Sequence, residues 1–294
     1  MRPVADRYIL RGVAATLSFQ FTDADGEPAA PAGAVTVGVA EADGTVVVAA
    51  GTSTAGTGTD PRTYTLAAQT TLELLTVTWT DAGDSSTHTQ LVEVVGGYWF
   101  SVADASARDD KLNDRAKYPT PRILAVRAEV EVEAENITGQ AWVPRYRREE
   151  IAGTGNDTLV CDEVAIRTVR SVRAYSSDGT TYTSWTAAEI AELTFTAHGT
   201  IIRPGVWAKG TKYVVEYEHG HDRPTADLRD AAITRLRHRL NSHRSGIPDR
   251  ATSMSTEQGQ TFALATPGLR GFVTGIPDVD VVYGRHALDR FGVA

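Results

Sequence analysis

The sequence predicts a β-sandwich at the N-terminus, then an α+β domain with long helices, and an extended C-terminal arm. Up to Val95, short runs of alternating apolar and polar residues are separated by turn sequences such as Asp25-Gly26 and Asp43-Gly44. After Tyr98 the apolar spacing becomes helical, and beyond Gly246 repeated glycine and proline favour extended chain. The predicted domains therefore cover residues 1–97, 98–246 and 247–294.

The first domain shows the period-2 pattern of half-buried strands. One face consists of Leu17, Phe19 and Phe21, and a second strand carries Val35, Val37 and Val39. Further strands are expected from their apolar and β-branched content over Val46–Ala49, Tyr64–Leu66, Leu74–Trp79 and Thr89–Val95. About seven strands at this spacing in under 100 residues are typical of an immunoglobulin-like sandwich.

A longer helix is expected over Thr120–Thr138, with Pro121 in its first turn and Gly139 placed to stop it. It is preceded by a short helix around Ser101–Leu112. The longer helix carries an apolar stripe made of Ile123, Val126, Val130, Ala134 and Ile137. A second, roughly opposite stripe consists of Leu124, Ala128 and Val132. Because a surface helix needs to bury only one stripe, the second predicts contact with another chain or with the N-terminal domain.

Short strands and turns between Trp142 and Glu218 predict a second sheet. A helix is then expected over Ala226–Ser242, opened by Pro224 and Thr225. This helix is rich in arginine, and some of its arginines lie within its apolar arc. Arg239 is one of these, so we assign it to the predicted subunit interface together with the second stripe of the longer helix.

The arm that follows Gly246 is predicted to build no core of its own, apart from a short helix near Val279–Phe291. Such a segment needs a partner surface, to which it can add a strand or a helix. The residues expected to dock on the partner are apolar and spread along the arm: Ile247, Phe262, Leu264, Val279, Val281, Tyr283, Leu288 and Phe291.

Composition and charge exclude several classes of protein. Hydrophobic residues make up 41% and charged residues 22%, as in folded globular proteins. The net charge of -8 is uneven, because residues 1–100 hold four Arg and no Lys against eleven acidic residues. An acidic front of this kind does not favour nucleic acid. Neither a membrane span nor an export signal is indicated. Cys161 cannot form an internal disulfide and is expected to be a small buried side chain.

Two interpretations of the arginine-rich helix remain open. Arg235, Arg237 and Arg244 can line a channel and contact phosphate groups. Alternatively, the helix arginines form ion pairs with Asp227, Asp230 or the glutamates of the longer helix, and this is the interpretation we favour.

Enzymatic and metal sites find little support in the motifs. His219, His221 and Asp222 have the spacing of metal ligands, but the remaining ligands of such a site are missing. Asp23 begins a calcium-like loop that lacks the rest of its pattern, so a hairpin turn is expected. Serine residues lack the Gly-x-Ser-x-Gly spacing of a nucleophile elbow. We therefore expect a non-enzymatic protein without a cofactor or metal.

From about Val102 to Ala294 the chain resembles the head-tail connector (adaptor) proteins of long-tailed bacteriophages. The order of several short motifs carries the resemblance: Tyr118-Pro119-Thr120-Pro121, Ile137-Thr138-Gly139-Gln140-Ala141-Trp142-Val143-Pro144-Arg145, Val169-Arg170-Ser171-Val172, Tyr182-Thr183-Ser184-Trp185-Thr186, Val214-Val215-Glu216-Tyr217-Glu218-His219-Gly220, Pro224-Thr225-Ala226-Asp227-Leu228, Ile247-Pro248-Asp249-Arg250-Ala251 and Gly275-Ile276-Pro277-Asp278-Val279-Asp280. Strand, turn, proline, helix and extended arm in this order are an uncommon combination.

The resemblance implies a virion protein at the head-tail interface. Its subunits would form a ring, expected to be a dodecamer, that docks on the portal protein, meets a stopper or tail-terminator protein, and leaves a channel for genomic DNA. The resemblance does not cover the acidic N-terminal sandwich.

A carbohydrate-binding or adhesion module carried by that sandwich is the alternative function. It requires an aromatic platform, for which Tyr8, Tyr64 and Trp79 are the candidates in the first domain. The later tryptophans are expected to serve as core or interface anchors: Trp99, Trp142, Trp185 and Trp207.

Overall fold

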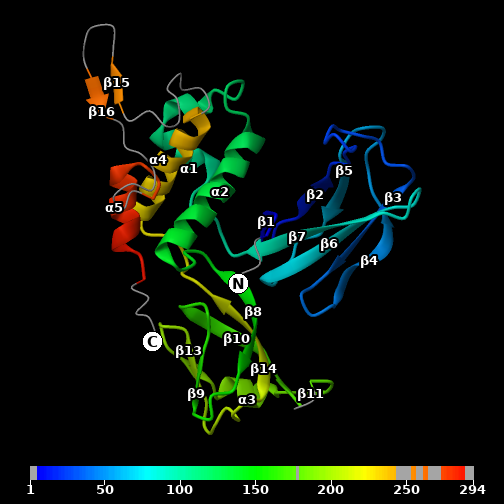
Figure 1. Ribbon diagram of the computed structural model, residues 1–294, viewed down its shortest axis with the longest axis vertical. Coiled ribbons are helices and arrows are strands. Elements are labelled where there is room, and N and C mark those ends of the chain that lie inside the picture. Colours follow the sequence, from blue (N-terminus) through cyan, green and yellow to red (C-terminus); the bar gives the residue numbers. More distant parts are fainter. Residues whose placement is uncertain (1–4, 177–178, 243–252, 256–260, 264–272, 289–294) are drawn as a thin grey trace. The chain divides into compact units, whose positions relative to one another are not determined.

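The chain divides into two compact units in the computed structural model, which describes residues 5–176, 179–242, 253–255, 261–263 and 273–288. The β-rich unit combines Met1–Gly97 with Val143–Asp222, and the helical unit combines Tyr98–Trp142 with Arg223–Ala294. The predicted boundary after residue 97 is also a unit boundary, whereas residues of the predicted 98–246 domain contribute to both units. Figure 1 shows the elements of each unit.

The N-terminal part of the β-rich unit is built from strands. Their bounds are β1 (Arg7–Leu10), β2 (Ala15–Phe19), β3 (Val35–Ala40), β4 (Val46–Ser53), β5 (Arg62–Leu66), β6 (Glu73–Asp81) and β7 (Thr87–Val95). One sheet has the order β1-β7-β6-β3-β4. Strand β1 runs parallel to β7, and the other neighbouring strands of the sheet are antiparallel to each other. Strands β2 and β5 pair with each other. The expected strands are thus present, and several extend beyond their predicted ends.

Alternation of apolar side chains places the core of this part. In β6, Leu75, Val77 and Trp79 are fully buried at every second position. Leu17 of β2 and Val37 of β3 join them in the same cluster. Because successive side chains of a strand point to opposite faces, the period-2 pattern in the sequence becomes one buried face per strand.

The second part of the β-rich unit holds two further sheets. The first has the order β11-β10-β14-β8 and the second the order β12-β13-β9. Their elements are β8 (Arg145–Ala152), β9 (Thr158–Val160), β10 (Ile166–Tyr175), β11 (Tyr182–Ser184), α3 (Ala187–Ala191), β12 (Thr194–Phe195), β13 (Thr200–Ile202) and β14 (Lys212–His219). Leu159, Ile201, Trp207 and Val215 belong to one core cluster, which includes the buried Cys161 as expected.

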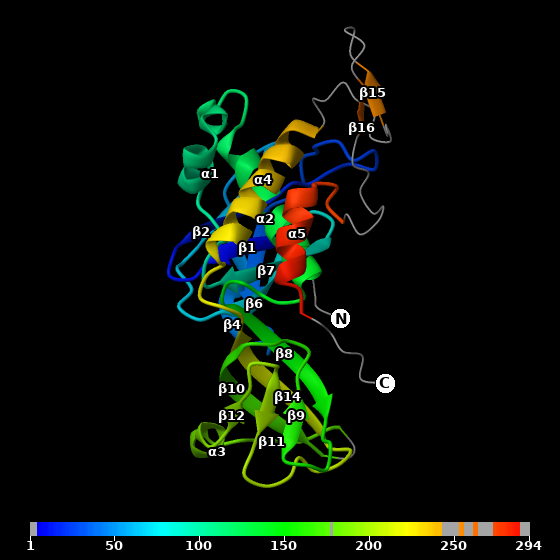
Figure 2. The same ribbon diagram turned by 90° about the vertical axis from the view of Figure 1, so that its left-hand side faces the viewer.

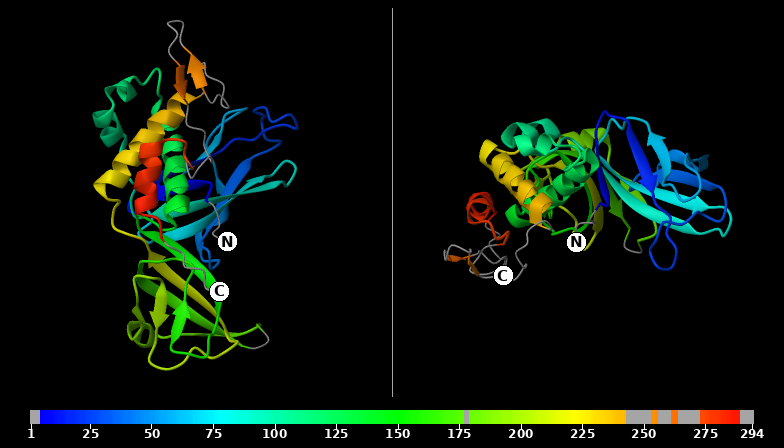
Figure 3. Two further views of the ribbon diagram at one scale, coloured as in Figure 1. Left: turned by 60° about the vertical axis from the view of Figure 1, so that its left-hand side comes forward. Right: turned by 90° about the horizontal axis from the view of Figure 1, so that it is seen from above.

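Helices dominate the second unit, in which Figure 3 shows α2, α4 and α5 running alongside one another. Its elements are α1 (Val102–Arg108), the 3-10 turn η1 (Asp110–Asn113), α2 (Thr120–Thr138), α4 (Ala226–Ser242), the hairpin strands β15 (Ser253–Ser255) and β16 (Thr261–Ala263), and α5 (Pro277–Arg285). Pro121 stands in the first turn of α2, and Gly139 caps it in the left-handed conformation with φ of 73°. Both predicted ends of this helix are confirmed.

One expectation about the C-terminal arm needs correction. Residues 273–288 do not lack a core, because α5 packs against α2 and α4 of its own unit. Val279 and Tyr283, at i and i+4 on α5, are both buried there. This spacing puts two apolar side chains on one face of a helix, and two neighbouring helices cover that face.

Candidate assembly surfaces

The α2 helix has one buried face and one outward face. Ile123, Val126 and Val130 are fully buried in the helical unit. On the outward face, the side chain of Leu124 is 39% exposed, while Ala128 and Val132 are partly buried. The two apolar stripes read from the sequence therefore have different environments, and the second leaves apolar surface exposed in the single chain.

Arginines of α4 form ion pairs with glutamates of α2. Arg235 makes two hydrogen bonds of 2.8 Å to the two carboxylate oxygens of Glu133, and its remaining Nη donates to the Thr274 carbonyl at 3.0 Å. Arg239 pairs with Glu129 at 2.8 Å and with Glu133 at 3.1 Å. The structure thus gives Arg235 and Arg239 the partners that the ion-pair interpretation names.

The same contacts change the assignment of Arg235 as a channel residue. Its side chain is only 12% exposed, and its guanidinium nitrogens are hydrogen-bonded to Glu133 and to the Thr274 carbonyl. It is therefore not available to passing phosphate groups. Arg237, on another face of α4, is 55% exposed and lies 3.9 Å from Asp109. Arg244 lies outside the described residues.

Glu133 forms ion pairs with both arginines, and these pairs change the pKa of its carboxyl. Burial acts to raise the pKa of the Glu133 carboxyl, but the hydrogen bonds and charges of Arg235 and Arg239 outweigh burial and hold the pKa below its ordinary value. Glu133 therefore stabilises the α2–α4 pair in its ionised form. That contribution is present above the ordinary glutamate pKa and is lost as the pH falls through the lowered one.

Polar contacts hold both ends of α5. At its N-terminal end, the Thr274 carbonyl accepts the hydrogen bond from Arg235 described above. At its C-terminal end, His286 Nε2 lies 2.9 Å from an Asp227 carboxylate oxygen, and Gln140 Nε2 donates to the His286 carbonyl at 2.9 Å. The Leu288 amide donates to the Thr138 carbonyl. Hydrogen bonds from Thr225 and His286 lower the pKa of Asp227 to about 2. Figure 2 shows α5 lying along α4.

The residues predicted to dock on a portal have different environments in the structure. Val279 and Tyr283 are buried against the chain's own helices, so in this conformation they hold α5 in place. Val281 is exposed on the other face of α5, and Leu288 is partly buried. Phe262 lies in β16, whereas Ile247, Leu264 and Phe291 lie outside the described residues.

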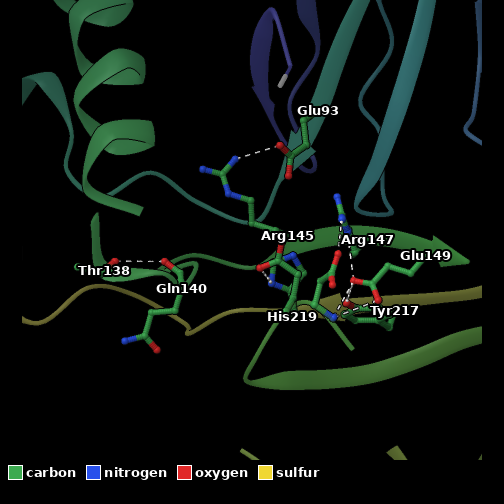
Figure 4. A network of polar contacts seen from close by, with 10 residues as sticks. Glu93, Thr138, Gln140, Arg145, Arg147, Glu149, Tyr217 and His219 are labelled. Atoms are coloured by element: carbon green, nitrogen blue, oxygen red, sulfur yellow. Dashed lines mark hydrogen bonds and ion pairs between the residues drawn. The ribbon is translucent and has the colours of Figure 1, made fainter. Parts of the chain in front are cut away.

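Within the β-rich unit, three ion pairs join acidic residues of the N-terminal part to arginines of the second part. We call these six residues the ionic seam: Asp43–Arg173 at 3.2 Å, Glu73–Arg170 at 3.3 Å and Glu93–Arg145 at 3.2 Å. Figure 4 shows the Glu93–Arg145 pair. Arg145 is 1% exposed and its guanidinium also lies 4.6 Å from the centre of the Tyr8 ring. Arg170 additionally donates to the Leu72 carbonyl.

Sequence reasoning missed the ionic seam, although its signal was present. The excess of acid in the first 100 residues is partly matched by arginines that follow in β8 and β10. A strand that carries Arg145, Arg147 and Arg148 in place of an apolar run indicates a face packed against carboxylates. Which arginine pairs with which carboxylate depends on strand register, and the register cannot be predicted from composition.

Glu73 gives the ionic seam a predicted pH dependence. Burial raises the pKa of its carboxyl to about 7, although Arg170 and the Leu74 amide act in the other direction. The folded-state pKa is thus above the unfolded one, so the contribution of Glu73 is fully present below about pH 4.5 and is lost as the pH rises through 7. Relative to Glu73→Gln, we expect the wild-type unfolding free energy to fall by about 1–3 kcal/mol over this range.

Urea denaturation of the wild type and of Glu73→Gln at several pH values measures this difference. The comparison isolates Glu73, because all other titrating groups are common to both proteins. A difference between the two that stays constant with pH would contradict the assignment.

A second buried polar cluster lies beside the ionic seam (Figure 4). Arg147 pairs with Glu149 at 3.3 Å, and the Tyr217 hydroxyl donates to the same carboxylate. The His219 ring nitrogen Nδ1 lies 3.8 Å from Glu163. These side chains come from β8, β14 and the segment after β9, so their contacts bind these segments together.

The candidate metal ligands do not converge in the structure. Asp222 forms an ion pair with Arg167 at 2.7 Å, and His219 is buried next to Glu163. Within the described ranges, no group of three or more His, Cys, Asp or Glu side chains could hold a metal ion. Asp23 accepts hydrogen bonds from the amides of Asp25 and Glu27, as expected for a turn.

Aromatic side chains of the first domain are engaged in packing. Trp79 is fully buried, Tyr64 packs against the core and Tyr8 meets the Arg145 guanidinium. The later tryptophans are also packed: Trp99 and Trp142 are buried, while Trp185 stacks on Trp207 with 5.1 Å between the ring centres. None of these residues offers the exposed platform that the carbohydrate-binding alternative requires. In the part of the chain that is described, no helix combines the length and apolar character needed to cross a membrane.

Comparison with known proteins finds several solved structures that are similar to this chain. One of them is a chain of the structure described as "Neck of empty GTA particle computed with C6 symmetry", at 14% sequence identity and a TM-score of 0.42. The match covers 67% of this chain and 93% of that one. No protein-family model matches, and no curated protein matches.

Proposed function

We propose that the chain is a structural, non-enzymatic subunit of the neck of a tailed phage or phage-like particle. It would assemble into a ring, expected to be a dodecamer, between the portal protein and a stopper or tail-terminator protein. Genomic DNA would pass through the ring, with Arg237 and Arg244 as the candidates for facing it. The order of motifs between Tyr118 and Asp280 supports this assignment.

The partly exposed apolar stripe on α2 is the observation that carries the proposal. The opposite face of α2 is already buried inside the chain, so Leu124, Ala128 and Val132 offer apolar surface that another copy would cover. In a closed ring each contact is heterologous, which means that this stripe meets a different patch of the neighbouring copy. Val281, exposed on α5, is a candidate for contact with the portal, together with Ile247, Phe262, Leu264 and Phe291 of the arm.

Electron microscopy of the purified chain tests the ring directly. We expect closed rings, and the number of subunits can be counted from end-on views. A chain that stays monomeric at every concentration used would rule out ring formation without its partners and would count against the proposal.

Leu124→Glu tests the α2 stripe. A carboxylate at an apolar contact between copies must be desolvated without a partner, so we expect the oligomer to dissociate and the apparent affinity between copies to fall at least tenfold, about 1.4 kcal/mol or more. The monomer should stay folded, because the position is partly exposed. Light scattering measures the mass and circular dichroism the fold. Val160→Glu, at an exposed position of the β-rich unit, is the matched control and should leave the oligomer intact.

A further inference from the structure

Helices α4 and α5 form an antiparallel pair, and each end of the pair has its own contact. His286, just after α5, meets Asp227 in the first turn of α4. Thr274, just before α5, accepts a hydrogen bond from Arg235 further along α4. We call the surface that receives α5 its seat, and define it by Asp227 and Arg235 on α4 with the Thr138 carbonyl and Gln140 at the end of α2.

The chain between these two helices is much longer than their geometry requires. Antiparallel helices in bundles are usually joined by roughly 2–8 residues. Here residues 243–276 separate the end of α4 from the start of α5. Because β15 pairs with β16, residues 253–263 add little length, so the other 23 residues of the connector set an upper limit of roughly 75 Å on its span. The connector is therefore long enough to deliver α5 to a seat on an adjacent molecule as well as to its own.

The contacts that hold α5 are few and partly unsatisfied. Val279 and Tyr283 are the buried apolar side chains on the helix. The Tyr283 hydroxyl and one carboxylate oxygen of Asp280 are buried without a hydrogen-bond partner among the residues that the structure describes. Burying a polar atom without a partner costs free energy, so α5 is held less firmly than its two anchors alone would suggest.

We propose that α5 is exchanged between copies, so that α5 of one subunit occupies the α2–α4 seat of its neighbour. This inference rests on the proposed function, because it needs copies that stand side by side. The exchange keeps every contact described above and needs no new surface, since the seat and the helix are identical in each copy. Loop closure cost grows slowly with loop length, so a long connector adds little penalty for reaching a neighbour. Such exchange would tie each subunit of the ring to the next.

Cross-linking between two cysteine variants tests the exchange. In a Cys161→Ala background, one chain carries Asp227→Cys and a differently tagged chain carries His286→Cys. The two are co-expressed and treated with a short bis-maleimide. If α5 is exchanged, we expect a covalent heterodimer that carries both tags, formed by up to about half of the His286→Cys chains in a random ring.

A chain with both substitutions gives a second readout. Exchange around a ring predicts a ladder of covalent oligomers, whereas a helix seated in its own chain predicts a single cross-linked monomer. Arg237→Cys, on the face of α4 that lies near Asp109, replaces Asp227→Cys as the matched control and should give no heterodimer.

Light scattering on the same samples separates failure of the exchange from failure of the ring. Assembled oligomers whose double variant cross-links only within single chains would overturn the exchange and leave the proposed function standing. Monomers in every sample would overturn both.

Discussion

Replacing Arg145 with methionine is expected to lower the free energy of unfolding of the β-rich unit by about 3–5 kcal/mol. Arg145 and Glu93 are both almost fully buried, and removal of the arginine leaves a carboxylate that has lost its counter-charge in a medium of low polarity. Such a loss is a large share of the 5–15 kcal/mol that typical domains possess. Urea denaturation followed by circular dichroism measures it.

The matched variants for this prediction separate charge from packing. The double variant Glu93→Leu with Arg145→Met removes both charges and should recover most of the lost stability, since buried ion pairs are often replaceable by apolar side chains. Lys212→Met breaks an exposed pair with Glu150 and should cost less than about 1 kcal/mol. If Arg145→Met were as mild as Lys212→Met, the Glu93–Arg145 pair would have no special importance.

Arg235→Leu is expected to destabilise the helical unit by about 2–4 kcal/mol, somewhat less than a fully buried pair because both side chains keep a little exposure. The substitution removes the bidentate contact with Glu133 and the hydrogen bond to the Thr274 carbonyl. We therefore expect faster amide hydrogen exchange in α5 than in the wild type.

The pH dependence of this effect has a definite sign. The lowered pKa of Glu133 means that the wild type loses the contribution of Glu133 on acidification, so the difference in unfolding free energy between wild type and Arg235→Leu should narrow as the pH falls below the ordinary glutamate pKa of 4.5. Arg237→Leu, at the exposed neighbouring position, should change stability by less than about 0.5 kcal/mol. Equal effects of the two substitutions would contradict the structural role that we assign to Arg235.

Much of the fold could be predicted because local patterns specify local structure. The β6 strand alternates apolar and polar residues, and the structure buries every second side chain. Helix α2 begins and ends where Pro121 and Gly139 indicate, since both residues restrict or permit particular backbone conformations wherever they stand. Contacts between distant segments leave weaker signals. Arg235 could be recognised as needing a partner, and the glutamates of α2 were among the candidates, but the choice between them and DNA required the helix packing.

The amino-acid sequence by itself determined which segments become strands and helices, that Arg239 would need a counter-charge, and that α2 carries two apolar stripes. These properties depend on the spacing of side chains along one element. Only the tertiary structure decided that Val279 and Tyr283 are buried against α2 and α4, and that Glu93 and Glu73 pair with arginines of β8 and β10. These contacts join residues far apart in the chain, and their geometry follows from how elements pack, which no local pattern encodes.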